Sequence, residues 1–469
     1  MMDSICFQNG YIEVNELKKK ALVYGAGNNF INQYNTISRL YHIVRVLDGA
    51  HDKLNMNIKG HSVEAASEEN IRLNDYDQII VTPKENKDIL NRLKNLGIED
   101  ERVVTISQIF DKAFINRPIQ IAIIYYGGMG DFLIGRNWLC YLTSFYSLEQ
   151  ECVDVYIDSV AYERGKEVFN TCEYVNDVLP IQTEYASLMD AEKYDLIMRF
   201  CIFPYVQSFA GDVIKKRNIQ FLKYILKLQS FGYENYCVGF CHNPNYYKVV
   251  RKLMEMFAGK QYHNYCDVFG DLGIKENFMF SLPTNMDEHA FLQKYGLIDK
   301  RFITIDTGLN KDYKGGSSTR AWRHSNWDEL ALEIKSSIPD VVTVQVGEKM
   351  SNEDDIHVDI HLNGKTDIYE ARILMKYATV HIDYDGGLVH VRHIMQGGPS
   401  VVLFGPTAVN RHTYSENIGI RTDACECDCE WTTERWLFDC PKGMKNPECM
   451  DSISPKLVCD KINEILIKD

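Results

Sequence analysis

The stretch 381–407 combines acids, glycines and a histidine in an order suited to binding an anionic ligand. Asp385, Gly386 and Gly387 follow an apolar segment of strand length, and His390 lies on the helix-like segment that comes next. The glycines allow a ligand to approach the backbone closely, and the free N–H groups at a helix start favour an anion such as a diphosphate. The alternative from the local pattern is a capped helix start with a histidine in the core.

These residues need a strand–loop–helix–strand unit to position them, and the sequence supplies one. Residues 378–382 and 399–404 are apolar and of strand length, and a Gly-Pro-Thr turn follows the second segment. Such a unit is the building block of a parallel sheet, in which ligands bind at the carboxyl ends of the strands. The stretch therefore predicts a ligand site at one edge of a parallel α/β sheet.

A second glycine-rich turn ends in an acid and follows the buried-strand pattern of residues 119–124. Gly127, Gly128 and Gly130 precede Asp131, and a helix-like segment follows. A carboxylate here can take a proton from an attacking hydroxyl group, or it can simply cap the helix. We expect the helix dipole to favour its charged form.

These two motifs resemble the ADP-heptose:lipopolysaccharide heptosyltransferase family (glycosyltransferase family 9), which are inverting enzymes with two facing Rossmann-like domains. Residues 385–390, Gly398-Pro399 and 403–407 match the donor-site signature, with Gly386 in place of the usual threonine. The turn at 127–131 resembles the opening of the family's catalytic region. The resemblance implies an α/β fold of the GT-B type and makes Asp131 the favoured general base.

A third segment of the resemblance begins at Arg320, with Trp322, Trp327 and Leu330 at the family's spacings. Arg323 stands where a proline is usual. Arg320 can bind a diphosphate bidentately and offset charge on the leaving nucleotide, so we expect no metal at the donor phosphates. A surface salt bridge is the alternative for Arg320, and Trp327 is expected in the core.

Two more strand ends complete the predicted donor site. The strand at 301–306 leads into Thr307, and the strand at 341–346 leads to Glu348, placed where such folds bind a ribose. A glycine/serine loop at 315–319 lies between them. The predicted donor-binding residues are Gly128, Gly130, Thr307, Arg320, Glu348, Asp385, Gly386, Gly387 and His390.

Five cysteines crowd into residues 425–449, namely Cys425, Cys427, Cys429, Cys440 and Cys449. In a reducing compartment, thiolates this dense predict a structural soft-metal site, iron or zinc, with four ligands. Free thiols are the alternative. The spacing leaves two sets open, Cys425 and Cys429 or Cys427 and Cys429, each with Cys440 and Cys449. This feature resembles the branch of the family that glycosylates bacterial autotransporter adhesins and binds iron through a cysteine finger.

The first hundred residues carry a weaker motif. Gly25 and Gly27 lie between a strand and a helix, and Asp48 ends a second strand about twenty residues later, as in a dinucleotide-binding fingerprint. The third glycine is missing, with Phe30 or Ile31 in its place. The alternatives are a live cofactor site and a structural or oligomerising module, and Asp48 fits a strand-end acid better than a ribose ligand. No Tyr-x-x-x-Lys accompanies the motif, which disfavours a dehydrogenase or epimerase.

Composition sets the remaining bounds. The 469 residues carry a net charge of −14, which argues against non-specific nucleic-acid binding. No stretch is apolar enough for a signal peptide or a membrane span, so we expect a cytoplasmic chain whose 14 cysteines do not form disulfides. We expect a Rossmann-like accessory domain at 1–115 and catalytic domains at 116–298 (acceptor side) and 299–469 (donor side, with the cysteine finger).

The sequence thus predicts an inverting glycosyltransferase that moves heptose from ADP-heptose to a hydroxyl of a glycan, such as lipopolysaccharide, or of a protein. A UDP- or GDP-sugar donor on the same scaffold is one alternative. A non-catalytic binding or scaffold protein derived from a transferase is another. The departures at Gly386 and Arg323 favour it, and the retained Asp131, Arg320 and His390 argue against it. The sequence leaves open whether the protein forms a homo-oligomer.

Overall fold

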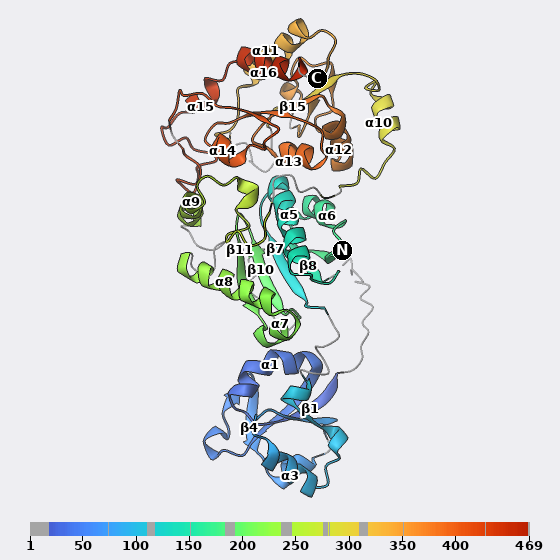
Figure 1. The fold of residues 1–469 in the computed structure, drawn as a ribbon, viewed down its shortest axis with the longest axis vertical. Helices are drawn as coiled ribbons and strands as arrows, with labels where there is room; N and C mark the ends of the chain where they lie inside the picture. Colours follow the sequence, from blue (N-terminus) through green and yellow to red (C-terminus); the bar gives the residue numbers. More distant parts are fainter. Residues whose placement is uncertain are drawn as a thin grey trace, which may run out of the picture. The chain divides into compact units, whose positions relative to one another are not determined.

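The structure is a computed structural model that combines parallel strands with flanking helices (Figure 1). The chain divides into two compact units, residues 1–119 with 190–195 and 210–219, and residues 120–189, 196–209 and 220–469. The residues described are 18–73, 75–109, 118–150, 152–182, 193–235, 246–274, 280, 282–308, 318–349, 351–426 and 428–467.

The first unit is built on a six-stranded sheet of order β3-β4-β2-β1-β5-β6, parallel except for β3. Apolar residues such as Val23 and Leu22 alternate between its two faces, and each face has its own core. The elements are β1 (Lys19–Tyr24), α1 (Asn28–Leu40), β2 (Tyr41–Asp48), β3 (Asn57–Ile58), β4 (His61–Ala65), α2 (Glu68–Arg72), β5 (Gln78–Val81), α3 (Lys87–Asn95) and β6 (Val103–Thr105), with α7 (Gly211–Arg217).

The second unit contains two sheets. The first of these has the order β11-β10-β7-β8-β9, with β11 antiparallel to its neighbour. All five residues of β7 are buried, as their unbroken apolar pattern predicts. The elements are β7 (Ile121–Tyr125), α5 (Met129–Phe145), β8 (Val153–Asp158), α6 (Tyr162–Phe169), β9 (Val175–Ile181), β10 (Leu196–Phe200), β11 (Pro204–Phe209), α8 (Ile219–Asn235), α9 (Tyr246–Met256) and the 3-10 turn η5 (Tyr262–Asn264).

The other sheet of this unit is fully parallel, with the order β14-β13-β12-β15-β16-β17. The strand order reverses between β12 and β15, which is where doubly wound sheets bind ligands. The elements are α10 (Glu288–Lys294), β12 (Phe302–Asp306), α11 (His324–Ser337), β13 (Val342–Val346), β14 (Ile360–His361), α12 (Ile368–Tyr377), β15 (Val380–Tyr384), α13 (Gly387–Ile394), β16 (Ser400–Leu403), α14 (Val409–His412), β17 (Ile418–Ile420), α15 (Glu448–Asp451) and α16 (Pro455–Leu466).

A buried arginine fixes α13 to the elements around it. The Arg392 guanidinium donates to the carbonyl oxygens of Met375 at 2.8 Å and Ala378 at 3.0 Å, at the end of α12. Its Nε bonds the carbonyl oxygens of Gly398 and Pro399, both at 3.1 Å, just before β16. Burial lowers the pKa of Arg392 to about 10, so the group stays charged and its carbonyl partners offset its desolvation.

The observed architecture confirms the predicted α/β fold class, with one Rossmann-like sheet in the first unit and two in the second. Trp327 is 1% exposed and lies in the core, as predicted. Within the part of the chain that the structure describes, every helix is too short or too polar to cross a membrane.

Candidate functional site

The first turns of α5 and α13 face one another within the second unit. A Cβ added at Gly387, the first residue of α13, would lie 3.2 Å from the Cβ of Met129. A Cβ added at Gly130 would lie 2.5 Å from Cδ2 of His390. The two glycines therefore permit a close approach of the two predicted motifs, although about 250 residues of sequence separate them.

Asp131 is held in a compact turn at the start of α5. Its Oδ2 accepts the backbone N–H of Gly128 at 2.8 Å, and its Oδ1 accepts the hydroxyl of Tyr262 on η5. Gly127 has φ +122°, and a Cβ there would lie 2.4 Å from Oδ2 of Asp131. The carboxylate thus caps the helix, as one reading of the sequence predicts, and it also has a partner from a distant segment.

The pKa of Asp131 shifts in the direction opposite to the sequence-based expectation. We expected the helix dipole to favour the charged form, but burial raises the pKa of this carboxyl group above its usual range. The bonds from Tyr262 and Gly128 and the charge of Arg320 oppose the rise without cancelling it, and Asp385 adds to it. Desolvation outweighs the dipole here because the charged form loses its water. A carboxylate with a raised pKa is a stronger base.

Arg320 and Asp385 lie together at the end of β15. Arg320 Nη1 donates to the backbone carbonyl of Asp385 at 2.7 Å and is 3.6 Å from its Oδ2. The guanidinium carbon also lies 5.2 Å from the ring centroid of Tyr384. With 18% of its side chain exposed, Arg320 is not a free surface residue. The main-chain and ring contacts place a cation beside the start of α13.

Two acids that the sequence analysis did not select lie at the carboxyl ends of β12 and β15. Asp306 ends β12 next to Thr307, and burial raises its pKa to about 7, with the Glu348 charge adding to the rise. Asp383 on β15 is fully buried, and burial followed by the charges of Asp306 and Asp385 holds its pKa well above the ordinary value. Their position at strand ends was the available signal.

Asp383 gives a physical reason for glycine at position 386. A Cβ at Gly386 would lie 2.7 Å from Oδ2 of Asp383, so a threonine there requires the buried carboxyl group to move. The local packing of this chain therefore favours glycine at position 386.

His390 is neutral and is fixed by an aromatic neighbour. Burial lowers its pKa to about 4, and its Nδ1 lies 2.7 Å from the hydroxyl oxygen of Tyr414. The Tyr414 ring stacks on His393, with the centroids 3.7 Å apart, and His393 Nδ1 lies 2.6 Å from Oε1 of Glu416. The histidine is both packed, as one reading predicts, and located at the meeting point of α5 and α13.

Tyr262, which the sequence reading missed, is positioned through α14. Its ring lies 5.3 Å from that of His412, whose Nε2 is 2.8 Å from Oε1 of Glu430. Burial lowers the pKa of His412, whereas the charges of Glu430 and Asp385 raise it. Their combined effect exceeds that of burial, so the pKa of His412 lies above its ordinary value. The neighbouring Gln261 donates to the carbonyl of Thr413 at 2.9 Å. No local motif marks Tyr262 in the sequence.

Four of the five clustered cysteines line one small cavity. Its volume is about 10 Å³, which is space for a single water-sized particle, and its cysteines are Cys425, Cys429, Cys440 and Cys449. Burial raises the pKa of Cys449 to about 11, and the nearby Cys425 and Cys440 contribute. The described residues contain no group of three His, Cys, Asp or Glu side chains in a metal-binding arrangement. Cys427 and positions 315–317 of the predicted glycine/serine loop lie outside the described residues.

One family model matches the N-terminal part of the chain. The family described as "C2185-like, N-terminal" matches residues 17–104. A search of curated protein sequences finds no match.

The structure is similar to several solved glycosyltransferases at low sequence identity. ADP-heptose lps heptosyltransferase II of E. coli is 14% identical, with 75% of this chain and 99% of that chain covered and a TM-score of 0.45. A family 9 glycosyl transferase of Veillonella parvula is 15% identical, with 76% and 99% covered and a TM-score of 0.49. The dodecameric, iron-containing heptosyltransferase TibC of enterotoxigenic E. coli, in complex with ADP-D-beta-D-heptose, is 13% identical, with 75% and 78% covered and a TM-score of 0.48.

Proposed function

We propose that this protein is an inverting glycosyltransferase that transfers a sugar, with heptose from ADP-heptose as the first donor to test, to a hydroxyl group of a glycan or a protein. One observation carries the proposal. The turn that holds Asp131 and the turn that precedes α13 lie against each other through Gly130 and His390. A base and an anion-binding helix start are therefore adjacent, and a sugar transfer needs both.

In the proposed reaction, Asp131 removes the proton of the acceptor hydroxyl as its oxygen attacks the anomeric carbon. A new C–O bond forms on one face of that carbon while its bond to the diphosphate breaks on the other, so the configuration inverts. The pair of electrons leaves with the nucleoside diphosphate. The Arg320 guanidinium and the backbone N–H groups at the start of α13 stabilise the charge that develops on the diphosphate.

The donor-side residues have distinct roles in this proposal. Arg320 is held beside the α13 start by the carbonyl of Asp385, which places its guanidinium where it can bind phosphate oxygens of the donor. Gly386 and Gly387 allow the diphosphate to approach the backbone, and His390 is a neutral hydrogen-bonding group. Thr307 and Glu348, which follow β12 and β13, are candidate contacts to the nucleoside. Gly128 and Gly130, at the start of α5, are the candidate donor contacts from the other sheet of this unit.

We also propose a structural iron or zinc ion at the cysteine cavity. Cys425, Cys429, Cys440 and Cys449 line a space of single-ion size, and ion binding would draw their thiolates into the tetrahedral shell that such metals prefer. Such an ion would tie the segment after β17 to α15. It would have no part in the sugar transfer, because all four positions around it would be taken by thiolates.

The function is tested by nucleotide release from ADP-heptose and from the common UDP-, GDP- and ADP-sugars with the purified protein. We expect one donor class to be hydrolysed or transferred. Asp131→Asn should lower turnover about 100- to 10,000-fold while donor binding persists, because the general base is lost. Arg320→Ala should weaken both binding and turnover.

Arg323→Ala is the matched control. Arg323 is three residues from Arg320 and pairs with Asp451 at the surface, so its removal should leave turnover unchanged. Absence of binding and turnover with every nucleotide sugar would contradict the proposed transferase activity and support the alternative of a non-catalytic scaffold. Turnover with a UDP- or GDP-sugar alone would support the transferase activity and show that ADP-heptose is not the donor.

A further inference from the structure

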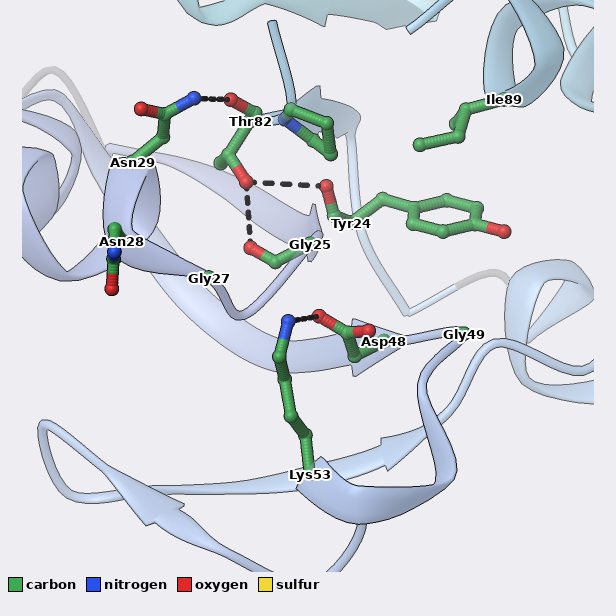
Figure 2. A pocket seen from close by; sticks show the side chains of 11 residues that line it. Tyr24, Gly25, Gly27, Asn28, Asn29, Asp48, Gly49, Lys53, Thr82 and Ile89 are labelled. Atoms are coloured by element: carbon green, nitrogen blue, oxygen red, sulfur yellow. Dashed lines mark hydrogen bonds and ion pairs between the residues drawn. The ribbon is translucent and has the colours of Figure 1, made fainter. Parts of the chain in front are cut away.

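The first unit contains a cavity that the proposed transferase reaction does not use. Its volume is about 470 Å³, and it lies at the carboxyl ends of β1, β2 and β5 (Figure 2). From β1 the chain order runs outward through β2 and β4 on one side and through β5 and β6 on the other. The cavity therefore lies where the strand order reverses, the usual ligand position in a doubly wound sheet. Its volume is in the range of small-molecule sites.

One end of the cavity can bind an anion. Helix α1 begins there with Gly27 as its N-cap, without a side-chain cap and without an acid in its first turn. The N–H groups of this turn and the positive end of the helix dipole favour a negatively charged ligand. The ammonium group of Lys53 adds a cation, because its Nζ would lie 3.6 Å from a Cβ at Gly27.

The two glycines of the motif have different roles. Gly25 is required by the fold, since its φ is +112° and a Cβ there would lie 2.6 Å from Oγ1 of Thr82. Gly27 has φ −84° and ψ −170°, a conformation open to any residue, and an added Cβ would make only the ordinary contact with Lys53. Protein packing therefore does not explain glycine at 27, whereas close approach of a ligand to the backbone does.

Asp48 fixes the backbone at the anion-binding end of the cavity, and its charge is paired with Lys53. Its Oδ2 accepts the N–H of Ala26 at 2.7 Å and lies 3.1 Å from Nζ of Lys53, and its Oδ1 accepts the N–H of Ala50 at 2.8 Å. This carboxylate ties the glycine loop to the turn after β2 through these backbone bonds. Figure 2 shows its ion pair with Lys53. An ammonium group has three N–H donors, so Lys53 retains capacity for a phosphate oxygen.

The other end of the cavity is apolar. The ring of Tyr24 and the side chains of Pro83 and Ile89 line this space, and Ile89 packs against the apolar cluster that contains Tyr24 (Figure 2). The Tyr24 hydroxyl accepts a hydrogen bond from Nη1 of Arg92 at 2.9 Å, which fixes the ring. A fixed aromatic ring beside aliphatic side chains suits a flat heterocycle.

We propose that this cavity binds a nucleotide, with its phosphate on the first turn of α1 and on Lys53 and its base against Tyr24, Pro83 and Ile89. This site is separate from the proposed donor site, which is built from other strands. The ligand is a nucleoside phosphate and not a free nucleoside, because the polar end of the cavity offers donors and a cation for an anion.

The test uses the full chain carrying Arg320→Ala, so that donor-site binding is suppressed. Hydrogen exchange followed by mass spectrometry is measured with millimolar AMP, ADP, UDP, GDP and NAD⁺, and with adenosine. We expect at least one of the nucleotides to slow exchange in peptides covering 24–31 and 48–54. Adenosine should have no such effect. Titration calorimetry then gives the affinity of the nucleotide that protects these peptides.

Gly27→Asp is the decisive variant. The new carboxylate caps α1, which favours folding, and repels a phosphate, so affinity should fall about tenfold or more while the thermal midpoint is kept. Ser67→Asp is the matched control, because it adds the same charge at the N-cap of α2, outside the cavity, and should leave affinity unchanged. Lys53→Met should weaken binding several-fold. The proposal is overturned if no nucleotide protects these peptides, or if affinity survives Gly27→Asp.

Discussion

The imidazole of His390 occupies the space that a side chain at Gly130 would need. An ideal Cβ on Gly130 would lie 2.5 Å from Cδ2 and 2.9 Å from Nε2 of that ring. His390 is held from its other side by the Tyr414 hydroxyl, 2.7 Å from Nδ1, so it cannot move away freely. The contact joins two sheets of the second unit at the point where the proposed base and the proposed anion site meet.

Gly130→Ala should therefore impair activity without unfolding the protein. Alanine is the better helix former by about 1 kcal/mol, so α5 itself is not weakened. The clash with His390 should displace the Asp131 turn and lower turnover by about 10- to 100-fold. In a His390→Ala background the same change should cost little more. Normal kinetics for Gly130→Ala alone would contradict this reading of the contact.

Tyr262→Phe should shift the acid limb of the activity profile. The Tyr262 hydroxyl bond lowers the pKa of Asp131 against the effect of burial, so its removal should raise that pKa further. Less of the base is then ionised at low pH, and kcat/KM should begin to fall at a higher pH than in the parent protein. The phenylalanine ring preserves the contact with His412. An unchanged acid limb would show that Asp131 is not the titrating base.

Asp306→Asn should change how stability depends on pH. Burial raises the pKa of Asp306 to about 7 from an ordinary 3.8, so the folded state retains a proton that the unfolded chain releases. The stability from this proton is complete below the unfolded pKa and is lost as the pH rises through the folded value. Between roughly pH 4 and 7, the free energy of unfolding should therefore decrease by up to about 4 kcal/mol less in the variant than in the parent protein.

Urea unfolding across this pH range measures the effect. Asp340→Asn, an exposed acid two residues before β13, is the control and should follow the parent curve. Parallel curves for Asp306→Asn and the parent would contradict the assigned shift.

Serine in place of a cavity cysteine should reduce bound metal. Each of Cys425→Ser, Cys429→Ser, Cys440→Ser and Cys449→Ser removes one thiolate from the proposed tetrahedral shell. Elemental analysis should find about one iron or zinc per chain in the parent and less in these variants. Cys459→Ser is the control, because Cys459 on α16 is buried beside Ser337 of α11 and lies outside the cavity. A metal-free parent protein purified without chelators would refute the ion.

Arg392→Met should be strongly destabilising. It preserves much of the side-chain volume but leaves the buried carbonyl groups around α13 without their donor. We expect a loss of about 3–5 kcal/mol in the free energy of unfolding. Arg435→Met removes an exposed pair with Asp439 and should leave the free energy of unfolding almost unchanged. A loss below about 1 kcal/mol for Arg392→Met would show that water replaces the guanidinium.

Part of the site could be predicted from the sequence because its signals are local. The turns at Asp131 and Asp385 each follow an apolar strand and precede a helix within a few residues, so pattern alone locates them. The roles assigned to them, and the domain boundaries near 115 and 298, stay predictions. Asp306 could have been selected by the same rule, since it also ends a strand.

The sequence by itself determined the alternation of strands and helices, the glycine turns between them and the crowding of cysteines. Only the tertiary structure decided that Tyr262, 131 residues farther along the chain, donates to Asp131, and that His390 lies against Gly130. It also reversed the expected direction of the Asp131 pKa shift. Strand and turn preferences act between neighbours in sequence, whereas burial and through-space contacts depend on how distant segments pack, and no local pattern encodes that packing.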